Sequence, residues 1–187
     1  MAFVTELEHT SAPEVISLAK ARKQLQLETD FTEDDSLITD YIEAAIVQAE
    51  NYINSEITEK KFEIRGKSFD DVLGFKRQKI TSVDSFVYKN VEGAEATIDP
   101  ANYSLENVDK YENEIVFLEN YKIPEVKEYD PAAVTLSVTV GYGAGKVPKA
   151  IIKALLVMIT DSYEHRTDTV KEKSTASENA LHSYKRF

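Results

Sequence analysis

The spacing of apolar residues changes twice along this chain, and that change limits the fold more than any other feature. From about Asp34 to Ile57, apolar residues recur every three or four positions, which predicts one long helix. Between residues 60 and 140, several segments are rich in β-branched and aromatic residues, as strands are. A helical spacing returns after Pro148. This order predicts an α+β fold in which a helical scaffold carries an inserted, antiparallel β-rich unit.

The segments before the long helix are short and weakly patterned. Residues 1–16 are expected to form a loose leader, with at most a short strand at Val15–Ile16. Ser17 can cap a short helix over Leu18–Leu25, because its hydroxyl can accept a hydrogen bond from an amide of the first turn. The sequence Ser11-Ala-Pro-Glu14 also resembles a capping box, which leaves an earlier start of this helix open.

The remaining helices also have start signals. Thr32 precedes Asp35 by three residues, which predicts that the Thr32 hydroxyl caps the long helix. Pro148 suits a first helical turn, and the segment from there to about Arg166 is apolar around most of its circumference. This segment should therefore be the central helix. A last short helix is predicted from about Ser177 to Lys185.

Within the β-rich stretch, the clearest strands can be placed individually. Ser82–Tyr88 and Ala94–Ile98 flank a loop that contains Gly93, which predicts a hairpin. Ile115–Leu118 is a further strand candidate. Val134–Val140 alternates apolar with polar residues, as expected for a half-buried strand.

Length and composition narrow the classes of function. A length of 187 residues suits one domain, with a helical part at 17–59, the β-rich insertion at 60–140, and the central helix with a C-terminal helix or tail at 147–187. The 22 Lys and Arg stand against 33 Asp and Glu, and this net charge of −11 opposes gripping a DNA backbone or lying on an anionic membrane. The absence of Cys excludes thiolate nucleophiles and Cys-based zinc sites. No signal peptide or membrane-spanning segment is expected.

The glycine-rich segment Gly141-Tyr-Gly-Ala-Gly-Lys146 is the most tempting ligand site, because it lies between a predicted strand and a predicted helix. It is one residue shorter than a phosphate-binding loop, and Val147 stands where that loop has a hydroxyl residue. Pro148 also removes an amide that could donate to phosphate. We interpret the segment as a strand-to-helix turn that uses glycine's access to positive φ.

No catalytic, cofactor-binding or metal-binding site is predicted. Asp161 and His165 lie one helical turn apart, but a metal site usually needs three or four converging ligands, so they are expected to be a surface pair. The adjacent carboxylates of Asp34–Asp35 and Asp70–Asp71 do not face each other on a helix or a strand. This argues against an acid–base pair.

Tyrosines suggest contact surfaces instead. Several stand near helix ends or in loops, where a rigid amphipathic ring can bury area at an interface with little loss of entropy. An equal alternative is that they line strand faces. The residues concerned are Tyr111, Tyr121, Tyr129, Tyr142, Tyr163 and Tyr184. The basic and aromatic end Tyr184-Lys-Arg-Phe187 of this acidic chain is either frayed or a docking arm.

Several segments stand in a particular order and spacing. Ile16 to Leu25 is followed by a short acidic spacer and by Asp34-Asp-Ser-Leu-Ile38, which begins the long helix to Tyr52. The later segments are Val138-Thr-Val-Gly-Tyr-Gly-Ala-Gly145, Val147-Pro148, the helix end Tyr163-Glu-His-Arg166, and Ala180-Leu-His-Ser-Tyr-Lys-Arg186. Together they resemble the head–tail connector family of tailed bacteriophages, also called head-completion or adaptor proteins. The β-rich stretch resembles the larger subgroup of that family.

The resemblance implies a structural protein that is not an enzyme and needs no cofactor. In the family, copies form a ring beneath the portal protein, and the ring prolongs a channel through which DNA passes without specific binding. A stopper or tail-completion protein docks on the ring. The resemblance implies a place in the virion neck, after assembly in the cytoplasm of the bacterial host. No membrane is involved.

The expected contact residues lie in the last two helices. Tyr163 and Arg166 are expected at or near the subunit boundary, because they end the most buried helix. Residues 176–187 are expected to dock on the portal, with Leu181, Tyr184, Arg186 and Phe187 as contacts.

Two other interpretations remain open. A small soluble enzyme or ligand-binding domain would need a pocket with convergent polar groups between the β-rich unit and the helices. Another neck or tail-completion protein of the same kind of particle would differ in the partner that it captures.

Overall fold

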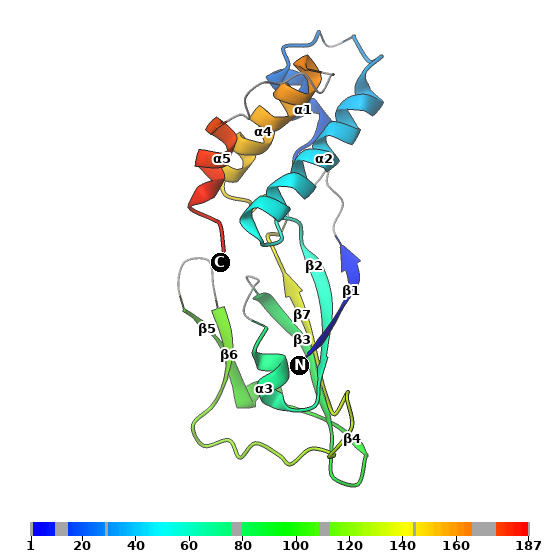
Figure 1. The fold of residues 1–187 in the computed structure, drawn as a ribbon, viewed down its shortest axis with the longest axis vertical. Coiled ribbons are helices and arrows are strands. Elements are labelled where there is room, and N and C mark those ends of the chain that lie inside the picture. Colours follow the sequence, from blue (N-terminus) through cyan, green and yellow to red (C-terminus); the bar gives the residue numbers. More distant parts are fainter. Residues whose placement is uncertain are drawn as a thin grey trace. The chain divides into compact units, whose positions relative to one another are not determined.

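The chain forms two compact units in a computed structural model, which describes residues 2–9, 15–28, 30–75, 80–108, 113–143, 145–165 and 175–186. The β unit comprises Met1–His9 and Glu59–Gly141, and the helical unit comprises Thr10–Thr58 and Tyr142–Phe187. Figure 1 shows the helices and strands of each unit. Helices together with antiparallel sheets confirm the predicted α+β fold.

The main sheet of the β unit has the strand order β1-β2-β7-β3-β4 within the described residues, and every neighbouring pair is antiparallel. Its strands are β1 (Phe3–His9), β2 (Lys60–Gly66), β7 (Val134–Val140), β3 (Ile80–Lys89) and β4 (Glu95–Thr97). A second sheet pairs β5 (Tyr103–Asn107) with β6 (Asn113–Phe117). The central strand β7 therefore has the bounds that its alternating pattern predicts.

The β3–β4 hairpin is confirmed, but other parts of the β unit correct the sequence-based prediction. Residues 3–9 form strand β1 rather than a loose leader, with Val4 opposite Ile64 on β2. The described Leu7 and Val4 side chains are largely exposed, so no burial pattern reveals this edge strand. Val15–Ile16 is not a strand, since it forms the bend before the first helix.

An aromatic cluster fills the core of the β unit. The Phe69 ring lies 5.7 Å from that of Phe86 and 5.6 Å from that of Phe117, edge to face in both pairs. Phe69 begins helix α3 (Phe69–Leu73), which the sequence analysis did not predict and whose first turn is capped by the Ser68 hydroxyl. The buried Asn113 of β6 accepts a hydrogen bond from the Ile80 amide of β3 at 2.9 Å, which links the two sheets.

The helical unit contains α1 (Leu18–Gln24), α2 (Asp35–Ile53), α4 (Lys149–Glu164) and α5 (Thr175–His182). The Ser17 cap is confirmed, because its hydroxyl accepts a hydrogen bond from the Lys20 amide at 3.3 Å. Helix α4 packs against α1, α2 and α5, as expected of a central helix. Its buried residues join those of α2 in one core: Ile38, Ile42, Ala45, Ile46, Ala49, Ile53, Ile151, Ala154, Leu155 and Ile159.

The helix ends differ from their predicted positions. Helix α2 ends at Ile53 because Asn54 has a left-handed conformation, with φ of 52°. Ile57 continues the apolar spacing and is buried, yet it lies beyond the helix, where its amide donates to the Glu50 carboxylate at 2.8 Å. Thr32 does not cap α2 with its hydroxyl, since Asp34 occupies the cap position and makes no side-chain capping bond.

At the C-terminal side, α5 begins at Thr175 and ends at His182, earlier than the predicted Ser177–Lys185. Helix α4 ends at Glu164, and the predicted end, Arg166, lies outside the described residues. None of the helices in the described ranges has the length and apolar character that crossing a membrane requires.

Candidate functional site

The end of α4 is tied to the start of α2. The half-buried Tyr163 donates a hydrogen bond from its hydroxyl to Oδ2 of Asp34 at 2.6 Å, across 129 residues of sequence. The Tyr163 ring also packs against the core of the helical unit. This predicted contact residue therefore has a role within its own chain, which the sequence analysis did not foresee.

Arg22 of α1 holds the connection between α1 and α2. Its guanidinium forms an ion pair with Asp35 at 3.2 Å and donates to the backbone carbonyl of Glu28 at 2.9 Å. It also donates to the carbonyl of Phe31. The carboxylates of Asp34 and Asp35 thus bind two different partners, Tyr163 and Arg22.

The C-terminal segment lies against the helical unit as far as it is described. Leu181 is only 1% exposed and belongs to the core, and Tyr184 packs against that core. The Arg186 amide donates to the carbonyl of Ile53, the last residue of α2, at 2.9 Å. Phe187 lies outside the described residues. Leu181 therefore fills its own chain's core instead of facing outwards.

The tyrosines singled out by the sequence analysis have different environments. Tyr129 is 95% exposed and has a positive φ of 62°. Tyr121 packs in the β unit, with its ring 5.4 Å from that of Phe117. Tyr142 is partly buried against the helical core, and Tyr111 lies outside the described residues. Among the described members of this set, Tyr129 is thus the one with a fully available ring.

The glycine-rich segment forms a turn between β7 and α4. Gly141 and Gly145 have φ values of 85° and 72°, which glycine adopts without the strain that other residues would incur. The carbonyl of Gly141 accepts a hydrogen bond from the Thr81 hydroxyl at 3.1 Å. Pro148 occupies the cap position of α4. This geometry agrees with the interpretation as a strand-to-helix turn.

The Asp161–His165 pair lies on the surface near the end of α4. Oδ1 of Asp161 and Nδ1 of His165 are 3.3 Å apart, and both side chains are well exposed. Within the described part of the chain, no group of three or more His, Cys, Asp and Glu side chains is arranged to hold a metal ion.

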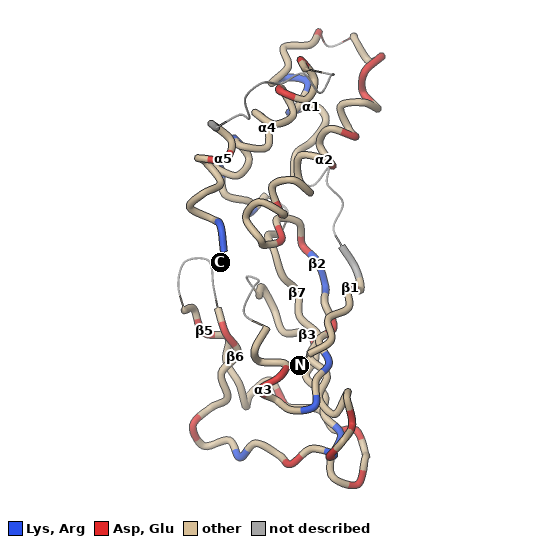
Figure 2. Tube along the Cα trace, viewed as in Figure 1, with Lys and Arg blue, Asp and Glu red and all other residues tan. Residues whose placement is uncertain are grey.

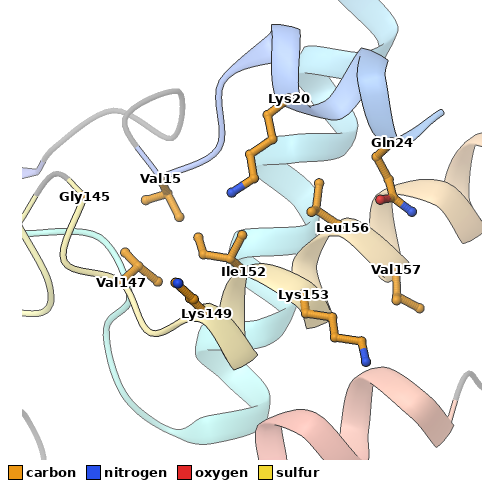
Figure 3. Close-up of a pocket in the computed structure, with 10 residues that line it drawn as sticks. All are labelled: Val15, Lys20, Gln24, Gly145, Val147, Lys149, Ile152, Lys153, Leu156 and Val157. Carbon is orange, nitrogen blue, oxygen red and sulfur yellow. The ribbon is translucent and has the colours of Figure 1, made fainter. Parts of the chain in front are cut away.

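A cavity of about 560 Å³ lies between α1 and the first half of α4 (Figure 3). Its apolar lining residues are Val15, Val147, Ile152, Leu156 and Val157, and its cationic ones are Lys20, Lys149 and Lys153. Figure 3 shows Lys20 extending from α1 towards Ile152. This site was not predicted from the sequence, although the two segments that form it lack Asp and Glu from 15 to 27 and from 142 to 160.

Comparisons with known proteins cover nearly the whole chain. A family model described as "Phage gp6-like head-tail connector protein" matches residues 15–186. The fold is similar to a solved structure described as "Neck of empty GTA particle computed with C6 symmetry", with a TM-score of 0.73 and 18% identity over 99% of this chain and 96% of the other. No curated protein matches significantly.

Two further solved structures have the same fold. One is described as "Virion of native gene transfer agent (GTA) particle", with a TM-score of 0.71 and 18% identity. The other is "Neck of native GTA particle computed with C12 symmetry", with a TM-score of 0.70 and 16% identity. Both matches cover 99% of this chain and 96% of the other chain.

The family match includes all described helices and every strand except β1, which precedes residue 15. It therefore includes the segments that carry the resemblance in the sequence, from the first helix to Arg186. Because the family model spans most of the chain, the protein belongs to the phage gp6-like head-tail connector family.

Proposed function

We propose that this structural protein of the phage neck assembles into a closed ring that joins the portal to a stopper or tail-completion protein. The ring prolongs the DNA channel below the portal. The match of a head-tail connector model to residues 15–186 carries this proposal. The similarity to neck structures across 99% of the chain supports it, since the fold suits that setting.

Cyclic symmetry supports the ring. The similar neck structures were computed with C6 and C12 symmetry. Identical subunits form such a ring when each presents two different, complementary surfaces, and the rotation between neighbours closes the circle. We therefore propose a ring of six or twelve copies.

The charge of the chain suits a channel through which DNA slides. A net charge of −11 repels phosphates on average, so a lumen formed by such subunits would not hold the duplex. No cofactor or catalytic residue is needed for this role. Assembly in the host cytoplasm and a final place in the virion neck complete the proposal.

Two regions remain proposed contacts. Arg166 is proposed for the subunit boundary together with the half-buried Tyr163. The end of the chain, with Tyr184, Arg186 and Phe187, is proposed to dock on the portal. Leu181 contributes to this contact indirectly, because it anchors α5 in the helical core.

The first test is light scattering after size exclusion over a concentration series, with negative-stain images of the most concentrated fraction. Closed rings with a central hole are expected, alone or after addition of purified portal protein. Capture of a tail protein but not of the portal would contradict the proposal and favour a tail-completion protein.

Docking on the portal needs a separate test. Truncation after Ser174 would remove Leu181 from the core, so the variant could fail to bind merely because it unfolds. Arg186→Glu is the better probe, and we expect a folded protein that no longer binds tail-less capsids. Unchanged capsid binding would contradict the proposed docking role.

A further inference from the structure

The helical unit carries a basic face on an acidic chain. Within this unit, residues 15–27 and 142–160 contain no Asp or Glu, although the whole chain has 33 of them. The cations of these segments include Lys20, Lys149 and Lys153, which line the cavity between α1 and α4. Within the described residues, these lysines form no ion pair. Figure 2 shows Lys and Arg at α1, whereas Asp and Glu mark the segment that leads into α2.

The cavity combines these charges with an apolar floor. Ile152 and Leu156 of α4 and Val147 before it are partly exposed and face the same space as the lysines. The first turn of α4 adds free amides, and its helix dipole favours an anion there. A ligand that suits this cavity therefore carries carboxylates beside an apolar side chain.

The segment that connects α1 to α2 in the same chain offers carboxylates beside an apolar side chain. Residues 28–35 hold Glu28, Asp30, Glu33, Asp34 and Asp35 with no cation among them. Asp34 and Asp35 are engaged by Tyr163 and Arg22 within the chain. The carboxylates of Glu28, Asp30 and Glu33 are exposed, and Phe31 between them is partly exposed.

Two backbone groups of this segment are held within the chain. Arg22 donates to the carbonyls of Glu28 and Phe31, which positions these two residues. Such preorganisation lowers the entropy that an interface must overcome.

We propose that the acidic segment Glu28–Glu33 of one copy docks in the basic cavity of the neighbouring copy. The inference rests on the proposed ring and names the contact that closes it. The two surfaces are different and complementary, so the contact is head to tail, as ring closure requires. Glu28, Asp30 and Glu33 pair with Lys20, Lys149 and Lys153, and Phe31 lies over the apolar floor.

Another copy suits the cavity better than DNA does. A phosphate backbone would use the lysines but leave the apolar floor without a partner, whereas an acidic segment with an aromatic residue uses both. A mobility-shift assay tests this directly. Binding of a short DNA duplex that depends on Lys149 and Lys153 would overturn the proposal.

Charge reversal with rescue is the main experiment. The variant K149E/K153E should fold, because both lysines are exposed and Glu at position 149 is favourable in the first turn of α4, and circular dichroism checks this. We expect the concentration for half-assembly to rise about tenfold or more, as for other close charge pairs at interfaces. Adding E28K, D30K and E33K in the same chain should restore assembly. K23E is the matched control, since Lys23 is exposed on α1 but does not line the cavity.

Two results would overturn the proposal here. One is that K149E/K153E assembles at the wild-type concentration. The other is that E28K/D30K/E33K fails to restore assembly in a folded variant of K149E/K153E. Either result leaves the ring itself, and thus the proposed function, intact.

A cross-linking experiment separates the two proposals, since it does not need a stable ring. The natural chain has no Cys, so K153C can be labelled selectively with a benzophenone maleimide. After illumination at high protein concentration, covalent dimers should form. In these dimers, the label at position 153 of one copy should be attached to the peptide of the other copy that contains Glu28–Glu33. If the label attaches to this peptide but no rings are seen, the result would support the proposed contact and count against the proposed ring. No dimers above background, or attachment elsewhere in the partner copy, would overturn the contact.

Discussion

Tyr163 and Asp34 join the two longest helices of the protein by a 2.6 Å hydrogen bond between the phenol and a carboxylate. The bond links the last turn of α4 to the residue that caps α2. Asp34 forms no side-chain cap of its own helix. The Asp34 carboxylate therefore makes a tertiary hydrogen bond where it makes no local capping bond. This hydrogen bond holds the end of α4 beside the start of α2 inside the helical unit.

Tyr163→Phe should lower the free energy of unfolding by about 1–2 kcal/mol, because it removes a hydrogen bond to a charged acceptor and keeps the ring. Urea unfolding followed by circular dichroism measures this. Tyr41→Phe is the matched control, since Tyr41 of α2 also packs against the helical core. Equal stability losses in both variants would show that the Tyr163 hydroxyl has no special role.

Leu181→Ala should destabilise the protein by about 2–4 kcal/mol, because it opens a cavity in a core where Leu181 is 1% exposed. Val47→Ala on α2 is the control, since Val47 is largely exposed and its truncation should change stability by about 0.5 kcal/mol or less. Chemical unfolding of both variants checks this. A negligible effect of Leu181→Ala would mean that α5 does not hold to the helical core in solution.

Asp130 should contribute stability that is lost in acid. The amide of Ala132 at 2.9 Å and then the Lys89 ammonium at 3.0 Å hold the pKa of this carboxyl below its usual range. The contribution is fully present above the unfolded pKa of about 3.9 and is lost as pH falls through the lower folded pKa. Urea midpoints between pH 2 and 6 should therefore fall less steeply for Asp130→Asn. Parallel pH profiles for the variant and the natural protein would refute this.

Tyr103 should contribute stability that is lost at alkaline pH. Burial, and next the charge of Asp99, raises the pKa of this phenol above its usual value. The stability that this raised pKa contributes is fully present below the unfolded pKa of about 10. It is lost as pH rises through the higher folded pKa. An absorbance titration at alkaline pH should lose a late-titrating phenol in Tyr103→Phe. Tyr129→Phe, which removes an exposed phenol, is the control and should leave the late-titrating phenol of Tyr103 in place.

Arg166→Glu tests the proposed subunit boundary. Because Arg166 is proposed to lie at this boundary, reversing its charge should block incorporation into particles and leave a folded monomer. Particle purification with detection of the variant measures incorporation. Particles that contain the variant at the natural level would remove Arg166 from the boundary.

Locally encoded features could be predicted from the sequence. Ser17 caps α1 through a bond that spans three residues, and β7 alternates apolar and polar side chains because one strand exposes two faces. The turn at Gly141 and Gly145 has positive φ, which glycine adopts without strain, so the residue type itself favours it. Each of these signals lies within a few residues of the structure that it specifies.

The features that could not be predicted from a short stretch of sequence depend on contacts with residues elsewhere in the chain. Strand β1 exists through its pairing with β2, and α2 ends before the buried Ile57 because Asn54 turns the chain and Glu50 receives the freed amides. The basic cavity arises only when α1 and α4, more than a hundred residues apart, are packed together.

The sequence by itself determined the succession of a helical part, a β-rich part and a second helical part, the family and the acidic net charge, since periodicity and composition are properties of the chain alone. Only the tertiary structure decided that Leu181 is a core residue, that Tyr163 is held by Asp34, and that lysines from separate helices share one apolar cavity. The physical reason is that burial and electrostatic pairing depend on which residues meet in space, and these residues meet through packing rather than through their spacing in the chain.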